Sequence, residues 1–239
     1  MRVFLAGAAG AIGRRLVPLL LSAGHDVTGT TRSAETASDL ARAGVVPAVL
    51  DVFDARAVTT AVRAAKPAVV IHQLTDLPRQ FDQALVVASY AKNARIRTEG
   101  TRNLIAAAQA ASARRFIVQS IAFAYAPGGE PHPESDPFNL ADPVRAVTVK
   151  GAADMEQLVL SASGLDAIVL RYGLLYGPGT WRAASSDKPG LHVDAAAHAA
   201  LLAITRGAAG VYNIADDDGA VSIAKARAEL GLDPRFRAP

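Results

Sequence analysis

Apolar and polar positions along the chain follow two alternating patterns. Short apolar runs, expected as buried strands, alternate with alanine-rich stretches whose apolar residues recur every three or four positions, as on one face of a helix. In the first such stretch Ile12, Leu16 and Leu20 share a face, and Gly24 follows as a stop. The expected strands span residues 2–6, 26–30, 45–50, 68–73, 115–120, 166–171 and 210–214. The expected helices span residues 11–23, 55–65, a long segment ending near residue 111, 155–161 and 194–205.

Strands that alternate with helices at this spacing predict a parallel sheet, because right-handed crossovers place helices on both of its faces. The expected fold class is therefore α/β, a doubly wound parallel sheet (Rossmann fold) with a small C-terminal substrate cap. Residues 1–176 are assigned to the sheet domain and residues 177–239 to the cap, from which strand 210–214 returns to the sheet. Segments rich in proline and glycine, 126–143 and 177–190, are expected as loops over the carboxyl edge, where such sheets bind ligands.

Composition and charge exclude several classes of function. The chain has 239 residues, 51% of them hydrophobic, and no cysteine, which excludes disulfides and thiolate metal sites; we expect a cytoplasmic protein without a metal. The net charge of +3 comes from scattered basic residues, and only 5% of residues are aromatic, so no nucleic-acid partner is expected. The apolar N-terminal run contains Arg14 and Arg15, which a signal peptide would not place there, so no membrane partner is expected either.

A glycine triplet follows the first expected strand and opens the first expected helix. In the segment FLAGAAGAIGRRL, Gly7 permits a tight turn, Gly10 lets the backbone approach a pyrophosphate, and Gly13 lets helix and strand pack closely. The backbone of Ala11 and Ile12 lies at the helix N-terminus, whose partial positive charge favours phosphate. This context predicts dinucleotide binding.

The end of the second expected strand indicates which dinucleotide is bound. An NAD-binding fold usually places a carboxylate there, to accept a hydrogen bond from the ribose 2′-hydroxyl, but this chain has Arg32 between Thr31 and Ser33. A guanidinium pairs with a 2′-phosphate. We therefore expect NADP as the cofactor, with NAD possible and a surface role for Arg32 as the alternative.

Several further motifs make the chain resemble the extended short-chain dehydrogenase/reductase superfamily, in particular its NAD-dependent epimerase/dehydratase branch. Besides the glycine triplet, these motifs are Asp51-Val52, Val70-Ile71-His72, Glu99-Gly100-Thr101-Arg102-Asn103-Leu104, Leu170-Arg171-Tyr172 and Tyr176-Gly177-Pro178-Gly179. The resemblance covers about residues 1–214. The connections after Trp181 and after Asp218 look short for the family, which indicates either a truncated cap or residues that the sequence omits.

The resemblance implies a role for each part of the cofactor site. Asp51 would contact the adenine amino group, with Val52 packed beside the adenine, unless Asp51 only caps the following helix. Gln73, Leu74 and Thr75 would line the middle of the cofactor, and Tyr172 and Gly173 would approach the nicotinamide end. His72 is interpreted as a core residue rather than a catalyst.

The family's catalytic tyrosine, four residues before a lysine, is absent. None of the five tyrosines has a lysine four residues later. Alignment on Lys150 places Ala146 at the tyrosine position, whereas alignment on Glu156-Gln157 places Thr148 there and Ala152 at the lysine position. The family's catalytic serine or threonine falls on Ile121, beside Ser120, and its helical asparagine falls on Arg97. The candidate catalytic residues are therefore Ser120, Lys150 and Tyr125, which lies in the loop after strand 115–120, with water as another source of the proton. The alternative for Tyr125 is that it only packs against the cap.

Three functions remain compatible with a chain that keeps the cofactor motifs and lacks the tyrosine. The first is an atypical NADP-dependent oxidoreductase that reduces a small carbonyl substrate. The second is a non-catalytic NADP-binding redox sensor or scaffold, and the third is a nucleotide-sugar epimerase or dehydratase. The resemblance also implies a homodimer, which would pair through segments 84–111 and 152–160, rich in small and apolar residues.

Overall fold

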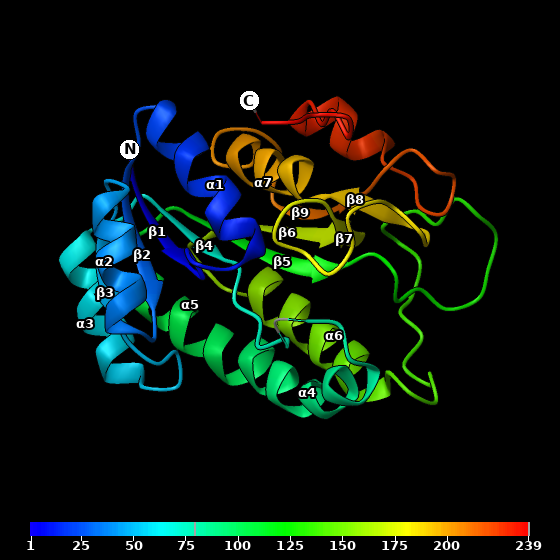
Figure 1. Cartoon of the computed structure of the whole chain (residues 1–239), viewed down its shortest axis with the longest axis horizontal. Helices are drawn as coiled ribbons and strands as arrows, with labels where there is room; N and C mark the ends of the chain where they lie inside the picture. The colour runs from blue at the N-terminus through cyan, green and yellow to red at the C-terminus, as the bar shows by residue number, and fades with distance from the viewer. Residues whose placement is uncertain (79, 239) are drawn as a thin grey trace.

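The computed structural model describes residues 1–78 and 80–238, and a seven-stranded sheet forms its centre (Figure 1). The strands of this sheet are β1 (Arg2–Ala6), β2 (Asp26–Thr31), β3 (Val46–Val49), β4 (Val69–His72), β5 (Arg115–Ile121), β6 (Asp166–Tyr172) and β9 (Gly210–Ile214). They are all parallel, in the order β3-β2-β1-β4-β5-β6-β9. From β1, strands β2 and β3 are added on one side, and β4, β5, β6 and β9 are added on the other. The strand order therefore reverses between β1 and β4, which confirms the predicted doubly wound sheet.

Helices cover both faces of the sheet, and each face has its own apolar core (Figure 1). One core joins the sheet to α1 (Ala11–Ser22), α2 (Ala34–Arg42) and α7 (Val193–Leu202). The other joins it to α3 (Ala55–Ala65), α5 (Thr101–Ala110) and α6 (Ala146–Leu160). The central strands are buried on both sides, which explains why they read as continuous apolar runs.

Helix α2 was not expected from the sequence. The Ser33 hydroxyl caps it by accepting a hydrogen bond from the Thr36 amide at 3.3 Å. Only Ala37 and Leu40 of this short helix are buried, so its apolar face is too narrow for a clear periodic signal.

The long helix expected to end near residue 111 is present, with an irregular turn in its middle. Helix α4 (Gln83–Arg95) passes through a π-helical turn, η1 (Ile96–Gly100), into α5. At Gly100 an added Cβ would lie 3.1 Å from a methyl group of Val52, so glycine allows this turn to approach the segment after β3 closely. The π-turn carries Arg97, and such turns are frequent at functional sites.

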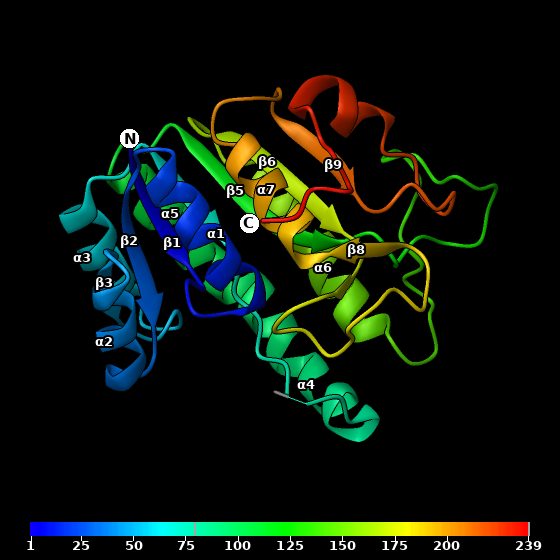
Figure 2. The same ribbon diagram turned by 45° about the horizontal axis from the view of Figure 1, so that its top comes forward.

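The C-terminal region packs onto the sheet domain. Strands β7 (Leu174–Tyr176) and β8 (Gly190–His192) form a separate two-stranded parallel sheet, and a π-helical turn, η2 (Ala226–Leu230), follows β9. Figure 2 shows the chain end crossing α7, where the Ala238 amide donates to Asp194 at 3.2 Å. Residues on both sides of the predicted boundary at 176 share one apolar core, and the boundary stays a prediction, as do both explanations of the short cap. Within the described residues, no helix is long and apolar enough to cross a membrane.

Candidate cofactor and substrate site

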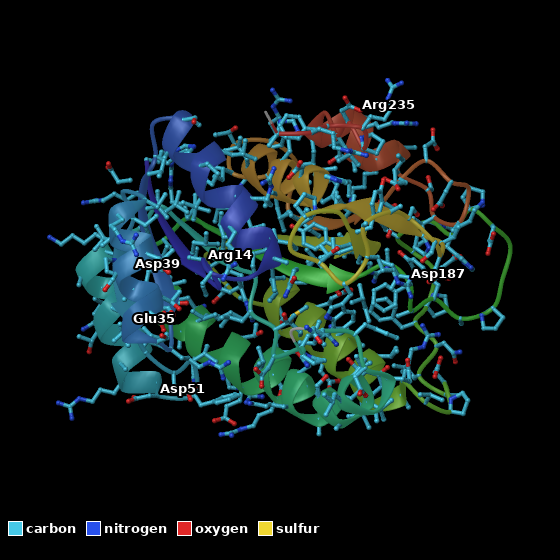
Figure 3. The ribbon with its side chains drawn as sticks, in the orientation of Figure 1. Arg14, Glu35, Asp39, Asp51, Asp187 and Arg235 are labelled. Carbon is cyan, nitrogen blue, oxygen red and sulfur yellow. The ribbon has the colours of Figure 1, made fainter. Side chains whose placement is uncertain are left out.

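A cavity of about 1240 Å³ lies at the carboxyl ends of the central strands. Its wall is formed by the β1–α1 turn, by the residues that follow β2, β3, β4, β5 and β6, by parts of α4 and α6, and by the segment around Trp181. Figure 3 shows Arg14 on α1 and Asp51 in the segment after β3, toward the side of the molecule that holds α2, and Asp187 in the loop after β7, toward the opposite side. The cavity has the position at which doubly wound sheets bind their ligands.

The glycine turn gives this cavity a surface for phosphate. Gly7 has a φ of 95° and its added Cβ would lie 2.8 Å from the Gln73 carbonyl oxygen, while a Cβ at Gly13 would collide with the Gly7 carbonyl. A Cβ at Gly10, in contrast, would meet only the Gly7 carbonyl oxygen, at 3.4 Å, and would otherwise point into open space. No side chain caps α1 at Gly10, so its first N–H groups, at Ala11 and Ile12, are available to an anion in the cavity.

Asp51 and Val52 line the end of the cavity that follows β3. The Asp51 carboxylate accepts a hydrogen bond from the Phe53 amide at 2.9 Å and is exposed, and Val52 is buried. The N-cap of α3 is Asp54, which accepts from the Arg56 and Ala57 amides. The alternative interpretation of Asp51 as the cap of this helix is therefore wrong.

Arg32 lies in the cavity wall with Thr31 and Ser33, and its guanidinium reaches across to a carboxylate. Its Nη2 donates to Asp76 at 3.1 Å, although the Arg32 side chain is 62% exposed. Burial tends to raise the pKa of Asp76, but hydrogen bonds from Lys92 and Arg32 outweigh this effect and lower it. A 2′-phosphate at this position would therefore compete with Asp76 for Arg32.

The middle of the cavity is lined by Gln73, Leu74, Thr75, Tyr172 and Gly173. The Gln73 amide nitrogen donates to the Tyr172 hydroxyl at 3.2 Å, and its Oε1 is buried without a partner in the described chain. Burial raises the pKa of Tyr172, which keeps this phenol neutral. At Gly173 a Cβ would lie 2.7 Å from the Gly190 carbonyl oxygen, so the backbone fits here only as glycine.

His72 has no access to this chemistry. Its side chain is buried between the Thr101 hydroxyl, at 3.1 Å, and the Leu74 amide, at 3.1 Å. Burial, helped by the charge of Arg97, lowers the pKa of His72 to about 3, so the ring is neutral. Its position fits the interpretation as a core residue.

Ser120 lines the inner end of the cavity, but its proton is already used. The Ser120 hydroxyl donates to Glu156 Oε1 at 2.5 Å, and the Glu156 carboxylate forms a buried ion pair with Arg171 at 2.7 Å. A hydroxyl that donates to a carboxylate can still accept a hydrogen bond, but it cannot donate at the same time to a second oxygen. Ser120 in this arrangement can therefore contact a substrate without being its proton donor.

Tyr125 is not among the residues that line the cavity, so the structure places it away from the position expected of a proton donor. Its hydroxyl donates to Asn213 Oδ1 at 2.6 Å and accepts from Arg171 Nη1 at 2.8 Å, and its ring stacks on His132 at 5.1 Å. Burial raises the pKa of Tyr125 despite the nearby Arg171. The loop after β5 turns this phenol toward Asn213 of β9, an arrangement that fits the alternative of a packing role.

Lys150 also lies outside the cavity. Its ammonium pairs with Asp154 on the exposed side of α6, at 2.7 Å, and its side chain is 68% exposed. Thr148, two residues earlier, faces the cavity, because two residues turn a helix by about 200°. The geometry thus gives Lys150 no place in the site.

The sequence did not single out Arg97 and Thr148 as site residues, although alignment with the family placed them at the asparagine and tyrosine positions. Arg97 Nη1 donates to the Thr148 carbonyl oxygen at 2.8 Å and to its Oγ1 at 2.6 Å, and both residues line the cavity. Desolvation lowers the pKa of Arg97 to about 10, so it stays cationic at neutral pH. The alignment with the family marked both positions, but the function of an arginine at position 97 could not be predicted without knowing its contacts.

The cavity therefore joins the uncapped N-terminus of α1 to a polar inner end, an arrangement typical of dinucleotide-binding α/β proteins. The model of the protein family described as NAD(P)H-binding matches residues 7–206 of this chain, so the protein belongs to that family. This match confirms the NAD(P)-binding family that the resemblance implied, and the solved structures below share the expected fold.

Known proteins similar to this chain include a reductase and two epimerases. The chain is 42% identical over 242 residues to a 3-diazoavenalumate denitrifying reductase from Streptomyces, covering 92% of this chain and 77% of that protein. UDP-glucose 4-epimerase from Thermotoga maritima, solved with UDP-glucose, has a TM-score of 0.80 at 19% identity and covers 99% of this chain and 94% of its own. The Thermus thermophilus enzyme, solved with NAD, has a TM-score of 0.80 at 20% identity and covers 100% and 95%. The epimerases establish the fold, and the family and the reductase define an NAD(P)-binding oxidoreductase.

Proposed function

We propose that the protein is an NADPH-dependent reductase that transfers a hydride to a small electrophilic molecule. The observation that carries this proposal is a single cavity in which the phosphate-binding turn leads to an inner end without a tyrosine–lysine pair among the described residues. Bound NADPH would supply the hydride. The protein would bind the cofactor, hold the acceptor beside it and exclude water.

We assign the cofactor contacts from the cavity wall. Gly7, Gly10 and Gly13 with the α1 terminus would hold the pyrophosphate, and Arg32 would exchange Asp76 for the 2′-phosphate. The adenine would lie by Asp51 and Val52. The nicotinamide ring would lie by Tyr172, Gly173 and Ser120.

The substrate class that we favour is an aryl diazo compound, because its reduction needs no protein acid. A hydride added to the terminal nitrogen of an aryldiazonium ion gives a neutral aryldiazene, which loses N₂ as its hydrogen passes to the ring carbon. The balance is one diazonium ion and one NADPH giving one arene, one N₂ and one NADP⁺. No oxyanion forms, which suits an inner end where the Ser120 proton is held by Glu156. The name of the Streptomyces relative, a diazo-compound reductase, supports this choice.

A small carbonyl compound is the second candidate, favoured by one contact. Thr148 Oγ1 accepts from the Arg97 cation at 2.6 Å, which leaves the Thr148 proton free to bind a developing alkoxide. A threonine hydroxyl is a much weaker acid than a lysine-assisted phenol, so carbonyl reduction at this site would be slow.

The test is a substrate panel with the purified protein. NADPH oxidation is followed by absorbance with an aryldiazonium salt, its carbonyl analogues and UDP-glucose, and the arene and N₂ are quantified against samples without protein. We expect NADPH consumption and arene formation in equal amounts with the diazonium salt. Turnover of carbonyls alone would select the second candidate. Tight NADPH binding with no turnover of any compound would contradict both and support a redox sensor.

We also propose that the protein forms a homodimer through α4 and α6, which pack against each other. Both helices expose apolar side chains, Leu85 and Val87 on α4 and Val147 on α6. Pairing of this two-helix surface with a second copy would bury them. Light scattering at micromolar concentration should give twice the chain mass, and a monomer would contradict the proposal.

A further inference from the structure

Arg97 and Arg14 are the two cationic side chains of the cavity wall without a carboxylate partner among the described residues, and of the two only Arg97 lies at the inner end. Arg15, Arg32, Arg145 and Arg182 each pair with an aspartate. Arg14 lies beside the phosphate-binding turn and donates to the Ala9 carbonyl oxygen at 2.9 Å. Arg97 is thus the cation at the inner end that no acidic side chain neutralises.

The nearest acidic group cannot serve Arg97. The charge of Glu156 acts on Arg97 through space, but the carboxylate of Glu156 already accepts from Ser120 and from two nitrogens of Arg171. A half-buried cation without a paired anion is costly. An anionic ligand in the cavity would offset this cost.

One edge of the Arg97 guanidinium, formed by Nε and Nη2, remains available. Nη1 makes both bonds to Thr148, and neither Nε nor Nη2 has a hydrogen-bond partner in the part of the chain that the structure describes. Neither nitrogen is fully buried, so both have access to the cavity that Arg97 lines. The Nε and Nη2 pair matches the two oxygens of a carboxylate.

Aromatic side chains form other parts of the same wall. Phe81, Tyr90, Phe123 and Trp181 line the cavity, with Phe81 packed edge-on against Trp181 at 5.6 Å. The Trp181 indole donates to the Pro78 carbonyl oxygen at 2.8 Å, which holds the 177–190 loop against the segment before α4. Such walls suit a flat apolar body.

We propose that Arg97, held in place by Thr148, binds the carboxylate of the substrate, and that this substrate is an aromatic carboxylic acid. This proposal rests on the reductase function proposed above, because the bound acid is a substrate only if the protein reduces it. It makes Arg97 a specificity-determining residue, which anchors one end of the acceptor while the hydride reaches the other.

The experiment measures binding without turnover. The protein is saturated with NADP⁺ and titrated with 3-phenylpropionate and with its neutral isostere 3-phenylpropionamide, by calorimetry and by fluorescence of Trp181, the one tryptophan of the chain. We expect the acid to bind at least tenfold more tightly than the amide. Equal binding of acid and amide would overturn the proposal, whether or not the protein reduces diazo compounds.

Three variants assign this preference to a residue. Arg97→Gln should bind acid and amide alike, and Arg97→Lys should keep part of the preference for the acid. The control is Lys150→Gln, which removes an exposed cation from α6 and should leave the preference unchanged. NADP⁺ affinity and the melting temperature report the fold of each variant. A full preference for the acid in folded Arg97→Gln would overturn the assignment. If Arg97→Gln fails to fold, the test uses Arg97→Lys and Thr148→Val. An unaltered preference for the acid in both of these variants would then overturn it.

Discussion

The two ends of the cavity differ in how their residues are held. At the phosphate end the backbone forms the site, through the turn of Gly7, Gly10 and Gly13 and the uncapped N-terminus of α1. At the inner end side chains form it, and each depends on another: Ser120 on Glu156, Glu156 on Arg171, Thr148 on Arg97. A backbone site keeps its chemistry when side chains change, whereas a side-chain site can be rebuilt. This contrast explains how a chain can retain the cofactor motifs of its superfamily and lose the tyrosine.

The largest expected effect concerns the buried ion pair that supports the inner end. Replacing Glu156 by alanine leaves Arg171 as an unpaired buried cation and should lower the free energy of unfolding by about 3 to 5 kcal/mol. Urea denaturation measures the change. The control Asp154→Ala removes the exposed partner of Lys150 and should cost about 1 kcal/mol or less. Equal losses in the two variants would contradict the idea that this network holds the inner end together.

At the phosphate end, Gly10→Val should abolish cofactor binding without unfolding the protein. The valine side chain would enter the space assigned to the pyrophosphate, while the protein offers it only one close atom, the Gly7 carbonyl oxygen. NADPH affinity should fall at least 100-fold, or by about 2.7 kcal/mol. Gly129→Val, at a loop position with open space around it, is the matched control. Wild-type affinity in Gly10→Val would remove the glycine turn from the cofactor site.

Arg32→Ala tests the choice of cofactor at the adenosine end. Loss of a charge-assisted contact to the 2′-phosphate should weaken NADPH binding about tenfold, or by about 1.4 kcal/mol, and leave NADH binding unchanged. Fluorescence titration with both cofactors measures this. Asp76→Asn should act in the opposite direction for NADPH, because it frees Arg32 from its carboxylate partner. Equal affinities of the wild type for both cofactors would contradict NADP preference.

The smallest expected effect is that of Tyr125→Phe on catalysis. Because the hydroxyl lies outside the cavity wall, kcat/KM should stay within about twofold of wild type, while loss of its bonds to Asn213 and Arg171 lowers stability by roughly 1 to 2 kcal/mol. Steady-state kinetics and thermal melting separate the two effects. A tenfold fall in kcat at unchanged stability would restore Tyr125 as a proton donor.

Prediction from the sequence succeeded where a pattern is local. Alternating strands and helices gave the sheet, and the bounds of β1 and β9 were predicted to the residue. It was less complete where the local signal is weak: α2 has only two buried residues, and α6 begins nine residues before the helix expected at residue 155. Most of the residues predicted to bind the cofactor line one cavity, because the positions of a glycine turn and of the ends of parallel strands are fixed by backbone geometry.

By itself, then, the sequence determined the doubly wound fold, the glycine turn and the absence of the tyrosine–lysine pair. Each of these depends on a local pattern: the alternation of strand and helix segments, the spacing of three glycines, and a spacing of four residues. Only the tertiary structure decided which polar groups meet at the inner end. Arg97 and Thr148 are 51 residues apart and touch because the π-turn of η1 packs beside α6. Tyr125 and Lys150 are turned away, the first by the path of the loop after β5 and the second by its phase on α6. Which way a side chain faces depends on everything packed around its element, and no short stretch of sequence contains that information.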